Sequence, residues 1–397
     1  MSLAQPDVTV VIGAYEAMPY LVACLDSVEA QTLDHDRIEV IAVDDGSTDG
    51  TGEYLEEFAA RTPLDVMVVR QDNSGGPSGP RNVGLGKATG RYVFFLDADD
   101  RLGPEALERM VAMADRNGTD VVLGRVEGVN RKPPTSMWGR TLERTDVFSS
   151  NIKFTLSAQK LFRRAFLERH SMRFDESLWT GEDALFTMEA YLRADGVSVI
   201  ADHACYYLVG REDGKHVTRT GSHTLRFDSA RALMILIADM VPAGARRDAL
   251  MVRPFLVTLL PQFGPKFLKD SEAVRREKLA LAKPLMDAHW TGEVAHRLRV
   301  HERLRLQLVA SERPDLLLEV LEFMRTTKTP EAVLEKGGRR VYFAYPHFRD
   351  RATGLPDSLY LAEPREAREV SGYREIGVDQ LLRRAVRKAR RVLIPAA

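Results

Sequence analysis

Short apolar runs alternate with amphipathic stretches along the first 125 residues of the chain. The apolar runs are rich in β-branched residues, as buried strands are, and they lie at 8–15, 38–46, 65–71, 92–96 and 120–126. Between them, apolar residues recur at helical spacing; Leu21, Leu25 and Val28, for example, fall on one helix face. Continuous apolar strands separated by helices predict an α/β domain with a mostly parallel sheet covered on both faces.

The pattern changes further along the chain. From about 222 to 340 nearly every segment has the periodicity of an amphipathic helix, and short strand-like pieces punctuated by proline follow. We therefore predict an α/β domain at 1–220, a helical module at 221–340, and a small region at 341–397 that ends in a basic helix.

The composition is that of an ordinary globular protein. Of 397 residues, 44% are hydrophobic and 28% are charged, and the formal net charge of -1 predicts no nucleic-acid partner. Cys24 and Cys205 lie in apolar patterns and cannot form a disulfide framework, which favours a reducing compartment. The N-terminal segment lacks the basic stretch of a signal peptide, and the longest apolar stretches fall short of the roughly 20 residues that span a bilayer. We therefore predict a cytoplasmic protein.

Candidate site residues follow the predicted strands. Four groups of residues come directly after the first four strands: Ala14-Tyr15, Asp44 to Ser47, Gln71 to Ser74, and Asp97 to Asp100. In a parallel sheet the carboxyl ends of the strands meet at one edge, where ligands bind. We expect the four groups, three of which contain carboxylates, to converge there.

The sequence Asp97-Ala98-Asp99 is a candidate metal site. In an extended backbone, residues two apart point to the same side, so Asp97 and Asp99 can converge on one ligand. Hard oxygen ligands favour Mg²⁺ or Mn²⁺. In the alternative interpretation, the aspartates only cap the next helix, a role that suits Asp100 ahead of Pro104.

Turn formation explains the two other polar segments only in part. Ser47, Thr48 and Asp49 suit a turn and a helix N-cap, whereas Asp45 comes earlier, at the sheet edge. The glycines at 73–90 match neither the dinucleotide fingerprint nor the phosphate-binding P-loop. Arg81 within this segment offers a planar fork of donors suited to a nucleotide.

Taken together, the motifs resemble a known family. The stretches "VTVVIGAYE", "VDDGSTD", "NSGGPSGPRNVGLGKATGRYVFFLDADD" and "WTGEDALF" resemble the nucleotide-sugar-binding half of glycosyltransferase family 2 over residues 8–215. The resemblance implies a GT-A fold, which is Rossmann-like, and inverting transfer of a sugar from a UDP-sugar to a hydroxyl group. The sequence departs from many members at Gly13 and Glu16, where Pro and Asn are frequent.

The resemblance also implies roles for individual residues. Asp45 would contact the uracil, Asp97 the ribose or a phosphate-side group, and Asp99 the metal ion. The implied donor-binding set is Ala14, Tyr15, Asp45, Asn73, Arg81, Asp97, Ala98, Asp99 and Arg211. Asp183 would be the catalytic base beside Glu182, and the helix dipole would keep it ionised. The alternative is that Asp183 only caps the helix predicted to begin at Glu182.

A polar loop follows the last predicted strand of the α/β domain. Arg211, Lys215 and His216 could close over the diphosphate, with His216 as a second metal ligand beside Asp99. The alternative is a solvated histidine without a ligand.

The segments after residue 220 resemble the branch of the family that glycosylates wall teichoic acid and other cell-wall polymers. This implies GlcNAc or a related sugar, a glycan, polyol-phosphate polymer or lipid-linked acceptor, and a homo-oligomer formed through 221–340 or the C-terminal module. Residues 381–397 carry six basic residues and no acidic ones, a pattern suited to an anionic membrane surface at the inner face. Packing against the protein itself or another subunit, or binding a polyphosphate acceptor, are the alternatives.

The sequence therefore predicts an inverting glycosyltransferase that depends on Mn²⁺ or Mg²⁺. A sugar-phosphate nucleotidyltransferase is one alternative, but it would need a glycine-rich basic loop where this chain has "GAYEAMPYL". A catalytically inactive polymer-binding or scaffold protein is the other, and the presence of Asp99 and Asp183 argues against it.

Overall fold

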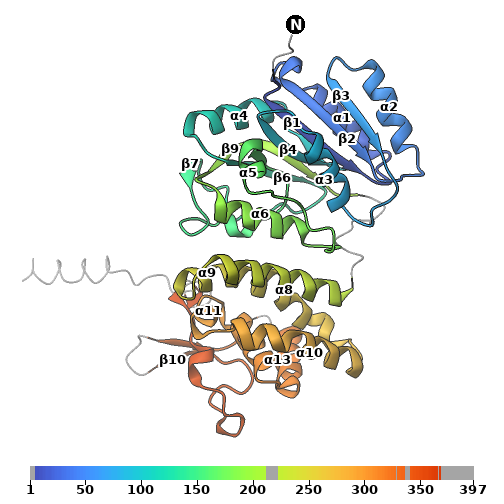
Figure 1. The fold of residues 1–397 in the computed structure, drawn as a ribbon. Coiled ribbons are helices and arrows are strands. Elements are labelled where there is room, and N and C mark those ends of the chain that lie inside the picture. The colour runs from blue at the N-terminus through green and yellow to red at the C-terminus, as the bar shows by residue number, and fades with distance from the viewer. Residues whose placement is uncertain (1–4, 212–221, 328, 336–339, 365, 368–397) are drawn as a thin grey trace, which may run out of the picture. The chain divides into compact units, whose positions relative to one another are not determined.

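The computed structural model describes residues 5–211, 222–327, 329–335, 340–364 and 366–367 (Figure 1). The chain divides into two compact units, residues 1–258 and 259–397. The domain boundaries at residues 220 and 340 stay predictions. Lys215, His216 and the basic segment 381–397 lie outside the described residues.

The first unit is built on a mixed sheet of strands in the order β3-β2-β1-β4-β8-β6-β9-β5, with β7 paired to β9. Its strands are β1 Val8–Ala14, β2 Ile38–Asp44, β3 Asp65–Arg70, β4 Tyr92–Asp97, β5 Arg101–Leu102, β6 Val121–Val129, β7 Leu142–Thr145, β8 Leu161–Arg163 and β9 Val197–Val209. Strands β1 to β4 are parallel to one another, as are β6 and β9, whereas β8 runs antiparallel to β4 and β6. The prediction of a mostly parallel sheet is confirmed, and each of the five predicted strands is present.

Strand register brings the carboxyl ends of the central strands level with one another. Ala14 of β1 pairs with Asp44 of β2, and Gly13 pairs with Asp97 of β4. The residues that follow these strands therefore leave the sheet at one edge.

Helices cover both faces of the sheet (Figure 1). They are α1 Tyr20–Glu29, α2 Thr51–Arg61, α3 Ser78–Lys87, α4 Ala106–Asn117, α5 Arg164–Arg169 and α6 Glu182–Arg193. Val10 and Ile12 of β1 share one core with Leu21 and Leu25 of α1. Because side chains alternate along a strand, Val11 faces the other side of the sheet, toward α3. Its side chain packs so closely against Gly84 of α3 that a Cβ atom on residue 84 would have no room.

Helices also predominate after the sheet, as predicted. The first unit ends with α8 His223–Met240 and α9 Ala245–Arg253, and the second contains α10 Glu272–His289, α11 Gly292–His296, α12 Val300–Ala310 and α13 Pro314–Thr326. A small antiparallel pair follows, β10 Ala332–Leu334 and β11 Val341–Phe343. Within the part of the chain that the structure describes, none of the helices combines the length and the apolar character needed to span a bilayer.

Candidate active site

A cavity of about 540 Å³ opens at the carboxyl edge of the sheet. Its walls contain every predicted site residue that lies within the described chain: Ala14, Tyr15, Asp45, Asn73, Arg81, Asp97, Ala98, Asp99, Glu182, Asp183 and Arg211. The structure therefore brings together the groups that sequence analysis expected to converge. Their individual roles stay predictions, and His216 lies outside the described residues.

Asp45 is held in a fixed orientation on one side of the cavity. It is buried, and its Oδ1 accepts hydrogen bonds from Gln71 Nε2 at 2.6 Å and from the Ser74 backbone nitrogen at 3.1 Å. Ser74 Oγ donates to the other carboxylate oxygen at 2.9 Å. Tyr15, by contrast, is 54% exposed, so its ring is free of the core and available at the cavity rim.

The segment after β2 acts mainly as a structural turn, as sequence analysis favoured. Asp49 Oδ1 accepts a hydrogen bond from the Thr51 backbone nitrogen, in the first turn of α2, at 3.1 Å. Glu16, noted above as a departure from many family members, accepts bonds from the Thr48 backbone nitrogen at 2.7 Å and from Thr48 Oγ1 at 3.0 Å. Glu16 therefore ties the loop after β1 to the loop after β2.

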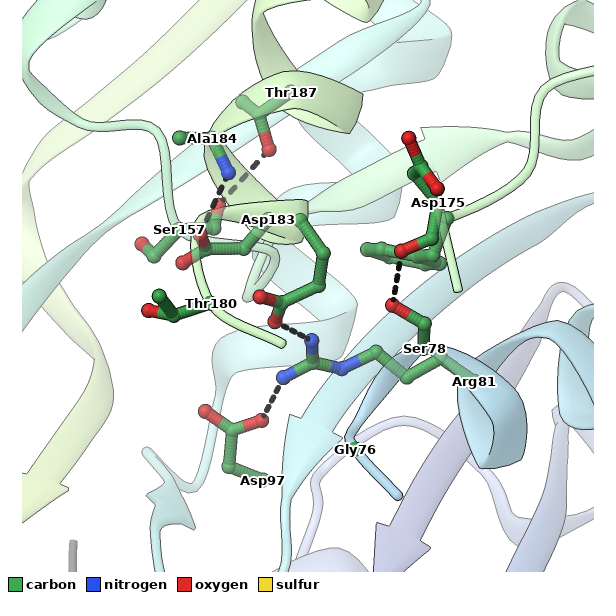
Figure 2. Close-up of polar contacts among 12 residues, drawn as sticks. Gly76, Ser78, Arg81, Asp97, Ser157, Asp175, Thr180, Asp183, Ala184 and Thr187 are labelled. Carbon is green, nitrogen blue, oxygen red and sulfur yellow. Dashed lines mark hydrogen bonds and ion pairs between the residues drawn. The ribbon is translucent and has the colours of Figure 1, made fainter. Parts of the chain in front are cut away.

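Arg81 joins two walls of the cavity (Figure 2). Its side chain is 11% exposed, with Nη2 2.7 Å from Asp97 Oδ1 and Nη1 2.8 Å from Glu182 Oε1. Burial alone would lower the pKa of the guanidinium group, but Asp97 and Glu182 outweigh burial and raise that pKa overall. Arg81 is therefore a fixed cation between the end of β4 and the start of α6.

Burial is the largest influence on the pKa values of the acidic pair at the start of α6, Glu182 and Asp183. It raises the pKa of Glu182 to about 7, with a further contribution from Asp183 and opposition from Arg81. It also raises the pKa of Asp183, against the opposing charges of Arg81 and Arg253. Burial therefore opposes the ionised form of Asp183, whereas the helix dipole and the two arginines favour it, and its role as an ionised base stays a prediction.

The aspartates after β4 have different surroundings. Asp100 is buried and accepts hydrogen bonds from Tyr206 Oη and the Val209 backbone nitrogen, both at 2.7 Å. It therefore anchors β9 and does not cap α4, which begins at Ala106. Asp99 lines the cavity, and burial together with the nearby charge of Asp97 raises its pKa to about 6.

Contacts with α8 fix the entry to α6. Gly181 has a φ of +85°, and a Cβ atom there would lie 2.7 Å from Ser229 Oγ of α8. Ser229 Oγ donates a hydrogen bond to the Thr180 carbonyl, which immediately precedes Gly181. The position of the acidic pair thus depends on a residue from the first helix after the sheet.

We expect Gly181→Ala to destabilise the first unit by about 2 kcal/mol or more, because a left-handed conformation costs a residue with a Cβ atom about 1–2 kcal/mol and the clash with Ser229 adds to it. Gly50→Ala is the matched control, since Gly50 is also a helix N-cap with positive φ but has nothing within 4 Å of the added Cβ atom. Denaturant unfolding of both variants measures the difference. Equal losses would show that the contact with Ser229 is unimportant.

Sequence reasoning missed several cavity residues: Arg131, Ser157, Gln159, Trp179 and Thr180. Arg131 could have been predicted in the same way as the other residues that follow strands, because it comes shortly after β6, and β6 runs parallel to β9. Trp179 and Thr180 belong to the motif "WTGEDALF" itself. Ser157 and Gln159 carried no pattern in the sequence that pointed to the cavity.

Two family models match the chain. The model for glycosyl transferase family 2 matches residues 9–173, and the model for the glycosyl transferase TarS linker domain matches residues 225–321. The pair Glu182-Asp183 lies between the two matched segments.

The chain is also similar to curated glycosyltransferases. The chain is 40% identical over 212 residues to a poly(ribitol-phosphate) β-glucosyltransferase of Bacillus spizizenii and 39% identical over 211 residues to the poly(ribitol-phosphate) β-N-acetylglucosaminyltransferase TarS of Staphylococcus aureus. Each match covers 53% of this chain, and the chain spans only 33% and 36% of the length of these relatives. It is also 30% identical to the succinoglycan biosynthesis protein ExoO of Rhizobium meliloti, over 74% of this chain and 86% of that protein.

Solved structures extend the similarity beyond the sheet. Residues 1–349 of S. aureus TarS, in complex with UDP-GlcNAc, superpose with a TM-score of 0.76 at 29% identity, covering 90% of this chain and 99% of the other. The fold is thus the predicted GT-A-type α/β domain followed by a helical region. The chain belongs to glycosyltransferase family 2.

Proposed function

We propose that this protein is an inverting glycosyltransferase that moves GlcNAc or a closely related sugar from a UDP-sugar to a hydroxyl group of a poly(ribitol-phosphate)-type cell-wall polymer. One observation carries the proposal: the strand-end carboxylates and the acidic pair of α6 line a single cavity. The similarity to a TarS structure that contains UDP-GlcNAc supports the donor, and the names of the curated relatives support the acceptor.

The nucleotide would bind at the wall formed by the first two strand ends. Asp45, oriented by Gln71 and Ser74, offers a carboxylate oxygen to the N–H group of uracil. The exposed ring of Tyr15 offers a stacking surface for the base. The donor sugar would then extend toward α6, between Asp99 and Asp183.

Asp183 would act as the general base. Its carboxylate takes the proton of the acceptor hydroxyl, whose oxygen bonds to the anomeric carbon as the bond from that carbon to the diphosphate breaks. Attack from the face opposite the leaving group inverts the anomeric configuration. Base assistance of this kind is typically worth about 10²–10⁴ in rate.

A divalent cation fits the residues at the end of β4. Asp99 lines the cavity, and its raised pKa reflects burial and the charge of Asp97, both of which a cation would relieve. The described residues contain no cluster of three or more His, Cys, Asp or Glu side chains suited to a metal ion, so phosphate oxygens and water would complete the coordination. Asp99, with His216 as a further predicted ligand, would hold Mn²⁺ or Mg²⁺, which neutralises the charge that develops on the departing diphosphate.

Release of UDP from UDP-GlcNAc in the presence of poly(ribitol phosphate) tests the proposal. We expect release to stop with EDTA and to return with Mn²⁺, and Asp99→Asn to lower the rate at least about 100-fold, since even the hydrogen-bond partners of metal ligands are typically worth 10–100-fold. Asp239→Asn on the exposed surface of α8 is the matched control. Activity unaffected by EDTA would remove the metal from the proposal, and no release with any UDP-sugar would favour an inactive polymer-binding protein.

The location and assembly of the protein are part of the same proposal. An acceptor polymer that grows at the inner membrane face would place the enzyme in the cytoplasm beside that membrane. The basic segment 381–397 would provide the attraction to anionic lipid, and the helices after residue 220 would provide the contacts of a homo-oligomer.

A further inference from the structure

Lys160 is a buried cation that the proposed reaction does not use. It directly precedes β8, and the residue is only 2% exposed. Its Nζ donates a hydrogen bond to the Ser157 carbonyl and lies 3.5 Å from Ser157 Oγ. Lysine is almost never fully buried unless it is paired with an opposite charge, so its position calls for a partner.

The turn that carries Lys160 is attached to α6. Thr187 Oγ1 donates to the same Ser157 carbonyl at 3.3 Å, and Thr187 lies one helical turn after Asp183. Figure 2 shows Ser157 beside Thr187 and Asp183. Ser157 and Asp183 both line the cavity, so the turn and the predicted base share one wall.

Asp183 is the carboxylate whose charge acts on Lys160. Burial lowers the pKa of the Lys160 ammonium to about 7, and the charge of Asp183 opposes this decrease. Among the described residues no carboxylate forms an ion pair with Nζ, so Asp183 acts on Lys160 through its charge and not through a direct contact. The other charged groups that face Asp183 are Arg81 of α3, Asp97 of β4, Arg253 of α9 and the neighbouring Glu182.

We propose that Lys160 is a positioning residue for the reaction: its buried ammonium group favours the ionised Asp183 carboxylate and holds the N-terminal half of α6 in place through Ser157 and Thr187. The proposal rests on the assignment of Asp183 as the base. Burial favours the neutral carboxylic acid, which cannot accept a proton, and the ammonium group of Lys160 adds to Arg81 and Arg253 in opposing this. Lys160 does not touch the substrates and acts only through Asp183.

The first test is a double-variant cycle on thermal unfolding, which needs no activity. Lys160→Met removes the charge and keeps the length of the side chain, and Asp183→Asn removes the opposite charge. We expect the decreases in Tm to be non-additive, with Lys160→Met costing less in the Asp183→Asn background than in the natural chain. Additive decreases would overturn the proposal whether or not the protein transfers sugar.

The second test is the pH dependence of kcat for transfer from UDP-GlcNAc to poly(ribitol phosphate). We expect Lys160→Met to move the acid limb of the profile upward by about one pH unit, a loss of about tenfold on that limb, with an unchanged KM for UDP-GlcNAc. Lys160→Arg should restore the profile in part.

Thr187→Val is the matched control, because it removes a hydrogen bond to the same Ser157 carbonyl and leaves the ammonium in place. An acid limb that Lys160→Met leaves unmoved, or that Thr187→Val moves equally, would overturn the proposal. Failure of the natural chain to transfer any sugar would instead overturn the proposed function, and the unfolding cycle would still decide whether Lys160 and Asp183 interact.

Discussion

Asp183→Asn is expected to lower sugar transfer by about 10²–10⁴-fold, the usual contribution of a general base, while UDP binding stays largely unchanged. The amide has nearly the shape of the carboxylate but cannot accept the acceptor's proton. Asp183 lies at the start of α6, whereas the nucleotide would be held by Asp45 and its neighbours at the other wall of the cavity. UDP release measures transfer, and calorimetry measures UDP binding.

Glu189→Gln serves as the control for Asp183→Asn. Glu189 lies on the same helix and pairs with Arg193, so its substitution changes the charge of α6 without reaching the cavity. We expect this variant to transfer sugar at close to the natural rate. A loss of UDP binding in Asp183→Asn as large as its loss of transfer would remove Asp183 from the role of base.

Arg81→Met is expected to abolish transfer and to destabilise the first unit by about 3 kcal/mol, because it leaves the carboxylates of Asp97 and Glu182 without their shared cation. Arg81→Lys should fold but still lose at least about 100-fold in transfer. A lysine has a single charged nitrogen and cannot replace a fork that binds two carboxylates. Denaturant unfolding and UDP release, measured on both variants, separate stability from activity.

Arg91→Lys provides the matched control for Arg81→Lys. Arg91 also joins two carboxylates, with Nε 2.6 Å from Asp7 Oδ1 and Nη2 2.9 Å from Asp115 Oδ2, but it is more exposed and lies outside the cavity. We expect little effect on transfer from this substitution. If Arg91→Lys impaired transfer as much as Arg81→Lys, the effect of Arg81 would reflect stability and not its place between β4 and α6.

The sheet and its functional edge were accessible from the sequence because both depend on local pattern. Strand and helix periodicity is a property of neighbouring residues, and parallel strands necessarily bring their carboxyl ends together. For this reason the amino-acid pattern alone assigns Asp45, Asp97 and Asp99 to one edge of the sheet. The start of α6 at Glu182 followed from the same local reasoning.

Residues whose contacts come from distant parts of the chain were not accessible in this way. Asp100 looked like a helix cap, but its carboxylate binds Tyr206 and Val209 more than a hundred positions away. Glu16 looked like a departure from the family, and only the fold shows that it secures Thr48. Lys160 gave no signal at all, because a lysine in a sequence is by default a solvated surface charge.

The sequence by itself determined five strands of the sheet, which are β1 to β4 and β6, the edge at which their polar ends meet, and which carboxylates lie at that edge. Tertiary structure alone decided the surroundings of those carboxylates: which are buried, which share Arg81, and which one interacts with the charge of Lys160. The physical reason is that the cost of a charge depends on the water and the opposite charges around it. Both are set by packing between segments far apart along the chain.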